Sequence, residues 1–487
     1  MTLVPALRLA LTGLLAKRPV ARLTLVVGAL LVVFTVFPGV LPRPHLALFT
    51  LDKPAAGQHK LASVPPQQRK GLGAVYSTHN CVGPSREGPE LDGNRCHFQN
   101  VCLELDNILR APQEYPQHNN FQRSSVSLTY FRPPAARDTP HYWNDEHRWI
   151  EPWVRIARDS YLTPEVVYAP MPENSRWSDA ETAVLQEAFW PENFGHSMGD
   201  DFLPVFRLAR SFGLWSRSDL QVITHPPCSD RGHPTRGCAH HAELSTLLLA
   251  RPLEDYNTSL FNAPPPFEGR ACFRNLLVGT RRLGMGFPSE HVWPEFVREL
   301  RVGAGLDPLA RPKRQRVVLL QKVGRRTVRN YDEVEDALRM RFEVDVEVVN
   351  PEELSLAEQL ERMQQTTVVV SPCGGVSFSA MFLPAGSSAV FIECVSFTPT
   401  MERFIYTYND NVMPFYYPVE KRDLHLDRSK LPDWVDPKDE YEVWRNWPNV
   451  TVDVKRMERY VFSALLHAEV SYGWHESFRM ESPAPLT

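Results

Sequence analysis

Strands and helices alternate between Gln315 and Val395, and this alternation restricts the fold more than any other feature of the 487-residue sequence. Runs of β-branched residues and leucine predict buried strands, and apolar residues that recur every three or four positions predict helices. The predicted elements are strands at Arg316–Gln321, Val344–Val348, Thr366–Val370 and Ala389–Glu393, and helices at Tyr331–Met340 and after the S-x-x-E capping box of Ser355 and Glu358. This order predicts an α/β lobe with a parallel sheet, for which we set the bounds at 291–482.

The part of the chain before this lobe is less regular. We expect a first lobe at 71–290, also of α/β type, because helical and extended patterns alternate in its middle part. Residues 75–140 mix aromatic residues, proline and cysteine without a clear period. They predict an irregular segment packed on the core.

An apolar segment, Leu23–Leu41, precedes both lobes and contains no charged residue. Its 19 residues approach the ~20 that a helix needs to cross a bilayer. Residues 1–22 hold four cations and no acid, so the positive-inside rule predicts that they are cytoplasmic and that the bulk of the chain is lumenal. A cleaved signal peptide and a buried core helix are the alternatives. The sequence therefore predicts a signal anchor at 23–41 and, after it, a proline-rich stem at 42–70.

The composition agrees with a globular protein and argues against a nucleic-acid binder. Lys and Arg number 53 against 57 Asp and Glu, so no basic excess is present. A lumenal location would permit disulfides and would make the N-x-[ST] sequons at Asn257 and Asn449 candidate glycosylation sites. We expect the protein in the membrane of the Golgi apparatus or of the endoplasmic reticulum.

Histidine and cysteine residues gather between His225 and His241. Cys228 and Cys238 could form a disulfide, could bind zinc with two of the histidines, or could remain free thiols. The spacing matches no common zinc finger, and an oxidising compartment favours the disulfide. The sequence keeps the three possibilities open and favours the first.

The segment Asn193–Asp201 places a histidine and a carboxylate four residues apart, at His196 and Asp200. On a helix these two positions share one face. An imidazole beside a carboxylate can transfer protons, so the pair is a candidate acid–base group, and Asn193 before it is a candidate orienting residue. The alternative is that these side chains only cap and orient the start of a helix.

A glycine pair follows the predicted strand that ends at Val370. Gly374 and Gly375 allow backbone N–H groups to approach a phosphate, and Ser377 can add a hydroxyl donor. The alternative is a tight turn that requires glycine for its backbone conformation.

A basic loop, Gln321–Asn330, follows the strand that ends at Gln321 and includes Arg325 and Arg326. Their guanidinium groups are forked donors that suit a diphosphate, although a solvated loop is the alternative. The carboxyl ends of parallel strands meet at one edge of a sheet, where ligands bind. We therefore expect this loop and the glycine pair to be neighbours.

Together and in this order, these segments resemble glycosyltransferase family 61. The matching segments are Asn193-x-x-His196-x-x-x-Asp200, the basic loop with Arg325, Arg326 and Asn330, Leu354–Gln359, Gly374–Gly375, and Phe382–Ser387 with Glu393. Cys96–Cys102 is similar to a Cys-paired segment found early in such domains. One position departs from the pattern, because Cys373 stands where family members usually carry a histidine.

The resemblance implies a single-pass type II membrane enzyme with a GT-B-like pair of Rossmann-like lobes. It implies inverting transfer of a sugar, of the pentose or N-acetylglucosamine class, from UDP to a glycan or protein hydroxyl. Asp200 or His196 would be the base. The residues implied at the nucleotide-sugar site are Arg325, Arg326, Cys373, Gly374, Gly375 and Ser377, with Glu393 accepting from the ribose hydroxyls.

No metal and no cofactor beyond the UDP-sugar substrate are expected, because Asp200 and Asp201 are adjacent and no convincing D-x-D triplet is present. Two other functions stay open. The chain could be a catalytically silent carbohydrate-binding protein. It could also be a thiol hydrolase with Cys373 as nucleophile and His196 as base, although S-P-C-G-G lacks the G-x-S-x-G pattern.

Overall fold

The structure is a computed structural model of the chain. It describes residues 74–82, 95–104, 124–137, 154–155, 160–188, 191–225, 228, 237–254, 269–280, 292–393, 401–406, 411–433 and 435–474. All of them belong to one compact unit, Leu72–Thr487. Within these residues, no helix is both long enough and apolar enough to span a membrane. The predicted anchor at 23–41, the stem at 42–70 and the sequon at Asn257 lie outside the described residues.

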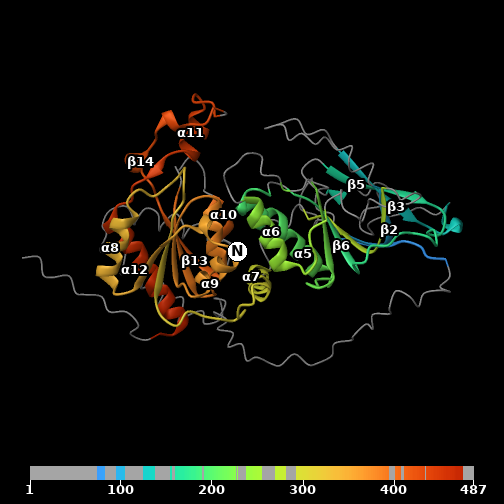
Figure 1. Ribbon diagram of the computed structural model, residues 1–487, viewed down its shortest axis with the longest axis horizontal. Helices are drawn as coiled ribbons and strands as arrows, with labels where there is room; N and C mark the ends of the chain where they lie inside the picture. Colours follow the sequence, from blue (N-terminus) through green and yellow to red (C-terminus); the bar gives the residue numbers. More distant parts are fainter. Residues whose placement is uncertain are drawn as a thin grey trace, which may run out of the picture. The chain divides into compact units, whose positions relative to one another are not determined.

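A five-stranded parallel sheet forms the second part of this unit, in the order β10-β9-β11-β12-β13. Its strands are β9 (Arg316–Leu320), β10 (Asp345–Val349), β11 (Val368–Pro372), β12 (Ser387–Ile392) and β13 (Val412–Tyr417). The strand order reverses between β9 and β11, and ligands of doubly wound sheets bind at the carboxyl ends beside such a reversal. Helices α8 (Tyr331–Phe342) and α12 (Val454–Tyr472) cover one face, and α9 (Leu356–Gln364) covers the other (Figure 1).

The predictions for 315–395 are confirmed, with element bounds that shift by a few residues. The capping box is present, because Glu358 N donates to Ser355 Oγ and Ser355 N donates to Glu358 Oε2 at 2.7 Å. The apolar side chains of α9 are buried, as their spacing predicted. Regular spacing was sufficient here because each strand is flanked by helices that cover it.

An eight-stranded sheet forms the first part of the unit, with β1 paired to β2 beside the order β4-β5-β3-β2-β8-β6-β7. Its strands are β1 (Thr78–Val82), β2 (Arg95–Glu104), β3 (Ser124–Phe131), β4 (Val154–Arg155), β5 (Ser160–Val167), β6 (Thr182–Glu187), β7 (Leu220–His225) and β8 (Arg270–Val278). Strand β6 is parallel to β7 and β8, whereas β2 is antiparallel to β1, β3 and β8. The sheet is mixed, which corrects the expectation of a Rossmann-like first lobe.

Two disulfides fix the antiparallel part of this sheet. Cys81–Cys96 joins β1 to β2, and Cys102–Cys272 joins β2 to β8, each between directly opposite residues. Cys96 and Cys102 lie six positions apart on one strand, about 20 Å, so they cannot bond to each other. Both cysteines are therefore paired, but with partners outside the Cys96–Cys102 segment.

The irregular segment expected at 75–140 instead contains strands β1, β2 and β3. Consecutive side chains of β2 are buried on opposite faces, with Val101 and Leu103 in one apolar cluster and Cys102 in another. Polar and apolar residues alternate only from Arg95 to Gln99, and the alternation breaks at Asn100, which has a φ of 54°. This break hides the strand from sequence reasoning.

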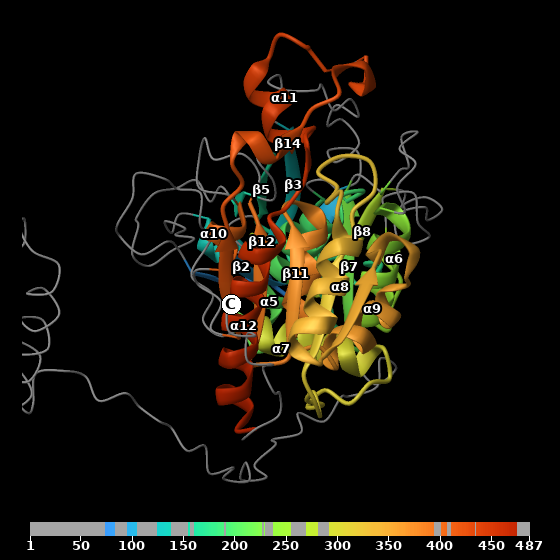
Figure 2. The same ribbon diagram turned by 90° about the vertical axis from the view of Figure 1, so that its left-hand side faces the viewer.

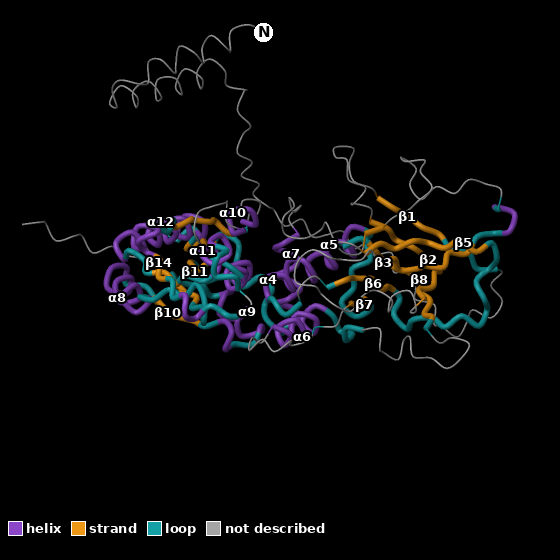
Figure 3. The backbone as a smooth tube through the Cα atoms, turned by 90° about the horizontal axis from the view of Figure 1, so that it is seen from above, coloured by secondary structure: helices purple, strands orange, loops and turns teal. Residues whose placement is uncertain are grey.

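One hydrophobic core joins the two sheets. Helices α5 (Leu203–Ser211), α6 (Gly237–Leu248) and α7 (Val292–Gly303) share it with α9 and with the 3-10 helix η6 (Gly375–Phe382) (Figure 3). Polar contacts also join the elements that share this core. Arg301 Nη2 donates to the Phe382 carbonyl at 2.8 Å, and Leu356 N donates to Glu243 Oε2 at 2.6 Å. The shared core fixes motifs from both parts of the chain in one place.

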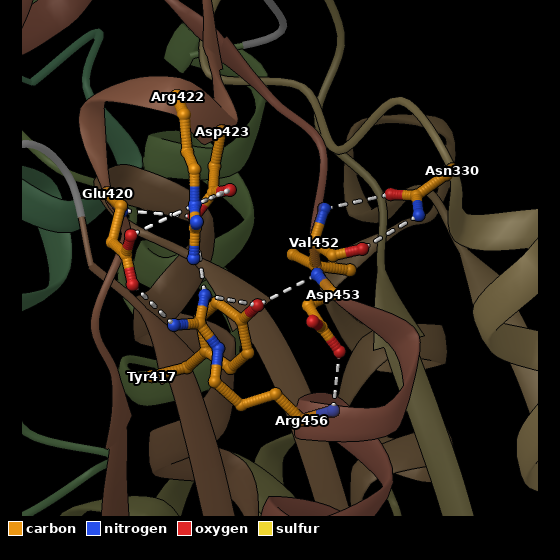
Figure 4. Close-up of polar contacts among 8 residues, drawn as sticks. All are labelled: Asn330, Tyr417, Glu420, Arg422, Asp423, Val452, Asp453 and Arg456. Carbon is orange, nitrogen blue, oxygen red and sulfur yellow. Dashed lines mark hydrogen bonds and ion pairs between the residues drawn. The ribbon is translucent and has the colours of Figure 1, made fainter.

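Residues 418–453, here called the excursion, extend beyond the carboxyl ends of the second sheet (Figure 2). They contain the strands β14 (Leu424–His425) and β15 (Asn449–Val450), which pair with each other, and helix α11 (Glu440–Asn446). Arg456 holds the base of the excursion by donating to Tyr417 Oη at 2.6 Å and Glu420 Oε1 at 3.4 Å (Figure 4). Asn330 exchanges two hydrogen bonds with the backbone of Val452, which ties the excursion to the loop after β9 (Figure 4).

Candidate functional site

Three segments that lie far apart in the sequence meet at the carboxyl ends of β9 and β11. The Arg326 guanidinium lies directly over Gly374, since a Cβ at Gly374 would be 2.8 Å from Arg326 Nη2. A Cβ at Gly375 would be 3.4 Å from Asn193 Oδ1. The basic loop, the glycine pair and the Asn193 segment are therefore neighbours. Gly374 also has a φ of +104°, so both the close approach and the backbone favour glycine there.

The basic loop brings several cations together in partly buried surroundings. Burial, together with the nearby charge of Arg325, lowers the pKa of Arg326 to about 10. Burial also lowers the pKa of Lys322 well below its ordinary value, as do the two neighbouring arginines. The Arg325 guanidinium lies 5.1 Å from the ring centre of Trp447. Like charges held together out of water favour the binding of an anion.

Glu402, which sequence reasoning missed, stabilises the glycine turn through hydrogen bonds. Its buried Oε1 accepts from Gly374 N at 2.7 Å and from Ser377 Oγ at 3.0 Å. Ser377 is fully buried, and its Oγ also lies 2.7 Å from the Gly374 carbonyl, so its single hydroxyl hydrogen is shared between the two acceptors. Both groups that the sequence proposed for phosphate hold the turn together in this structure, and their contact with a phosphate stays a prediction. No motif marks Glu402, because its partners lie 25 and 28 residues away.

Glu393 lies at the end of β12 and is buried. It forms an ion pair with Arg403, whose Nη2 donates to Glu393 Oε2 at 3.0 Å. Glu393 and Arg326 line the same small pocket, together with residues of the excursion. The lining residues are Arg326, Pro372, Cys373, Ile392, Glu393, Leu424, Trp444, Arg445, Pro448 and Val450. The structure thus brings the predicted ribose-binding and phosphate-binding residues together.

The cysteines of the candidate site are oxidised. Cys373 is buried and disulfide-bonded, so it offers no thiol, and the hydrolase with Cys373 as nucleophile is wrong. Cys228 and Cys238 form a disulfide with each other, which confirms the favoured pairing and corrects the zinc and free-thiol alternatives. Among the described residues, no group of three or more His, Cys, Asp or Glu side chains could hold a metal ion.

The predicted acid–base pair is in contact. His196 Nδ1 lies 2.7 Å from Asp200 Oδ2, and both side chains are partly exposed. Asn193 caps the short helix α4 (Phe194–His196) by accepting from Gly195 N at 3.0 Å, and a single π-helical turn, η3 (Ser197–Phe202), follows. The helical geometry therefore places His196 and Asp200 side by side, as their spacing predicted. Asp201 points into the protein and is 1% exposed.

His241 supports the same helical turn from the core. Its Nδ1 lies 2.7 Å from Ser197 Oγ, and burial lowers the pKa of His241 to about 4. The unfolded chain therefore binds an additional proton between pH 6.5 and about pH 4, so His241 favours folding above this range and ceases to do so as the pH falls through it. The free energy of unfolding changes by roughly 3 kcal/mol across this range because of His241.

We expect urea unfolding to show this loss between pH 7 and pH 4, and His241→Gln to reduce the slope of stability against pH. His425 is exposed, so His425→Gln is the matched control and should leave the slope unchanged. An identical slope in the parent protein and His241→Gln would contradict the assignment.

The segments that form this site also lie in the part of the chain that matches a known protein family. Residues 194–390 match the family model described as Glycosyltransferase 61, and none of the curated proteins matches the chain. The matched family is one of glycosyltransferases. The match supports membership of glycosyltransferase family 61, in agreement with the resemblance seen in the motifs. The matched span includes His196, Asp200, Arg326 and the glycine pair, and it ends before Glu393 and the excursion.

Proposed function

We propose that the protein transfers a sugar of the pentose or N-acetylglucosamine class from UDP to a hydroxyl of a glycan or protein. The reaction inverts the anomeric centre, needs no metal, and takes place between two lobes paired as in the GT-B fold. The contact among three motifs carries this proposal. The cationic Arg326 lies on Gly374, and the adjacent Gly375 lies against Asn193, which caps the helical turn bearing His196 and Asp200.

Each part of the site has a role in a single displacement. Asp200, or His196 beside it, removes the proton of the acceptor hydroxyl as its oxygen attacks the anomeric carbon. The bond between that carbon and the diphosphate oxygen breaks, and the diphosphate leaves with the electron pair. Arg325 and Arg326 stabilise the developing negative charge on the leaving group. Glu393 accepts from the ribose hydroxyls.

Calorimetric titration with UDP, followed by hydrolysis and transfer assays with UDP-xylose and UDP-N-acetylglucosamine, tests the function. We expect UDP to bind, UMP to bind more weakly because it lacks the second phosphate, and one donor to turn over. UDP binding without turnover of any donor or acceptor would identify the silent carbohydrate-binding alternative. Absence of UDP binding would overturn the proposal.

We also propose that the protein is a type II protein of the Golgi or endoplasmic reticulum membrane, with Leu23–Leu41 as its anchor. The charge asymmetry around this segment supports the orientation. The enzyme part would then be lumenal and glycosylated at Asn257 and Asn449. Endoglycosidase treatment of the protein expressed in cells should increase its gel mobility. An unchanged mobility, together with protease sensitivity from the cytosolic side, would contradict this topology.

A further inference from the structure

The last part of the excursion, around strand β15, lies against the basic loop and is hydrogen-bonded to it. Val450 N donates to the Thr327 carbonyl at 2.9 Å, and Arg329 N donates to the Val450 carbonyl at 2.8 Å. Thr327 N donates to Asn449 Oδ1 at 3.0 Å. With the Arg456 contacts to Tyr417 and Glu420, these bonds anchor both ends of the excursion beside the carboxyl ends of the strands.

Helix α11 of the excursion presents two residues to the pocket that contains Arg326 and Glu393. Val443 is the buried residue by which α11 packs, and the next two residues, Trp444 and Arg445, line the pocket. Arg445 lies near enough to Arg326 to lower the pKa of Arg326. The charge of Arg445 therefore adds to the positive potential in this pocket.

The orientation of Trp444 determines which of its atoms can contact a ligand in the pocket. Its indole Nε1 donates to Glu440 Oε2 at 2.7 Å, so the N–H group already has a partner within α11. Lys421 lies over one side of the ring, with its Nζ 5.3 Å from the ring centre, so Trp444 can add the remaining aromatic carbon surface to the pocket. A flat aromatic wall next to two guanidinium groups and one carboxylate suits a planar base, a phosphate and a sugar diol on one ligand.

We propose that α11 is the nucleotide-recognition element of this enzyme, with Trp444 stacking on the base and Arg445 contacting the phosphates of the donor. This inference rests on the proposed function and extends it to a segment outside the span that matches the family. Specificity for the nucleotide therefore comes from a part of the chain that the shared motifs do not include.

The test compares UDP affinities by calorimetry in variants of the full-length protein. Trp444→Ala should weaken UDP and UMP equally, by roughly 5- to 150-fold, because stacking involves the base. Trp444→Phe keeps an aromatic ring and should recover most of the affinity. Arg445→Met should weaken UDP by about 2- to 5-fold and reduce the salt dependence of binding, since this side chain is exposed.

Arg422→Met is the matched control, because Arg422 is an exposed arginine of the excursion that does not line the pocket. It should bind UDP as the parent protein does. Parent-like affinity in both Trp444→Ala and Arg445→Met would overturn the role of α11 while leaving the proposed transferase intact. If the parent protein itself binds no UDP, the proposed function and this inference fail together.

Discussion

Asp200→Asn should reduce turnover by roughly 10²–10⁴-fold while nucleotide affinity barely changes. The substitution keeps the size of the side chain and an oxygen that can accept from His196 Nδ1, which lies 2.7 Å from the carboxylate. It removes the basicity that the acceptor hydroxyl requires. Steady-state kinetics with a saturating donor measures the loss.

His196→Ala separates two assignments of the base. If His196 only orients Asp200, its loss should cost less than that of Asp200, and if His196 is the base, the order reverses. Asp201 is unsuitable as a control because it is buried, and its substitution would test folding instead. Glu192→Gln, directly before the motif, is the better control and should keep full activity. Full activity in both Asp200→Asn and His196→Ala would show that the base lies elsewhere.

Arg326→Ala should weaken UDP binding by roughly 10- to 150-fold, because a charge-assisted hydrogen bond to the diphosphate is lost. Arg326 has a φ of 61°, and alanine meets the same backbone strain, so the variant reports on the side chain. Arg329→Ala, at an exposed arginine of the same loop, is the matched control and should bind normally. Affinity equal to that of the parent protein would remove Arg326 from the diphosphate site.

Four of the five strands of the second sheet were predictable from the sequence because they and the helices between them follow simple periods, whereas β13 was not predicted. Arg316–Leu320 and Val368–Pro372 are short apolar runs between amphipathic helices, and helix α9 has a capping box that marks its start. Strand β2 was not predicted, because its alternation of polar and apolar residues breaks at Asn100. Its disulfide partners Cys81 and Cys272 lie 15 and 170 residues away, and no spacing rule connects them.

The candidate site shows the same division. His196 and Asp200 were found because four residues along a helix bring side chains together, and Arg326 and Gly374 because parallel strands end at one edge. Glu402 was missed, and so were Trp444 and Arg445 of α11. These residues reach the site only through tertiary packing, and they occur in no local pattern. Sequence periodicity therefore finds site residues that regular helices and strands bring together. The structure is needed to find site residues that only tertiary packing brings there.

The central claim is that one site combines a catalytic base from the first part of the chain with a diphosphate-binding group from the second. The most direct test is calorimetric titration of UDP into Asp200→Asn, Arg326→Ala and the parent protein. We expect Asp200→Asn to bind UDP as the parent protein does and Arg326→Ala to bind it roughly 10- to 150-fold more weakly. Equal loss of affinity in both variants, or no loss in either, would contradict this division of roles.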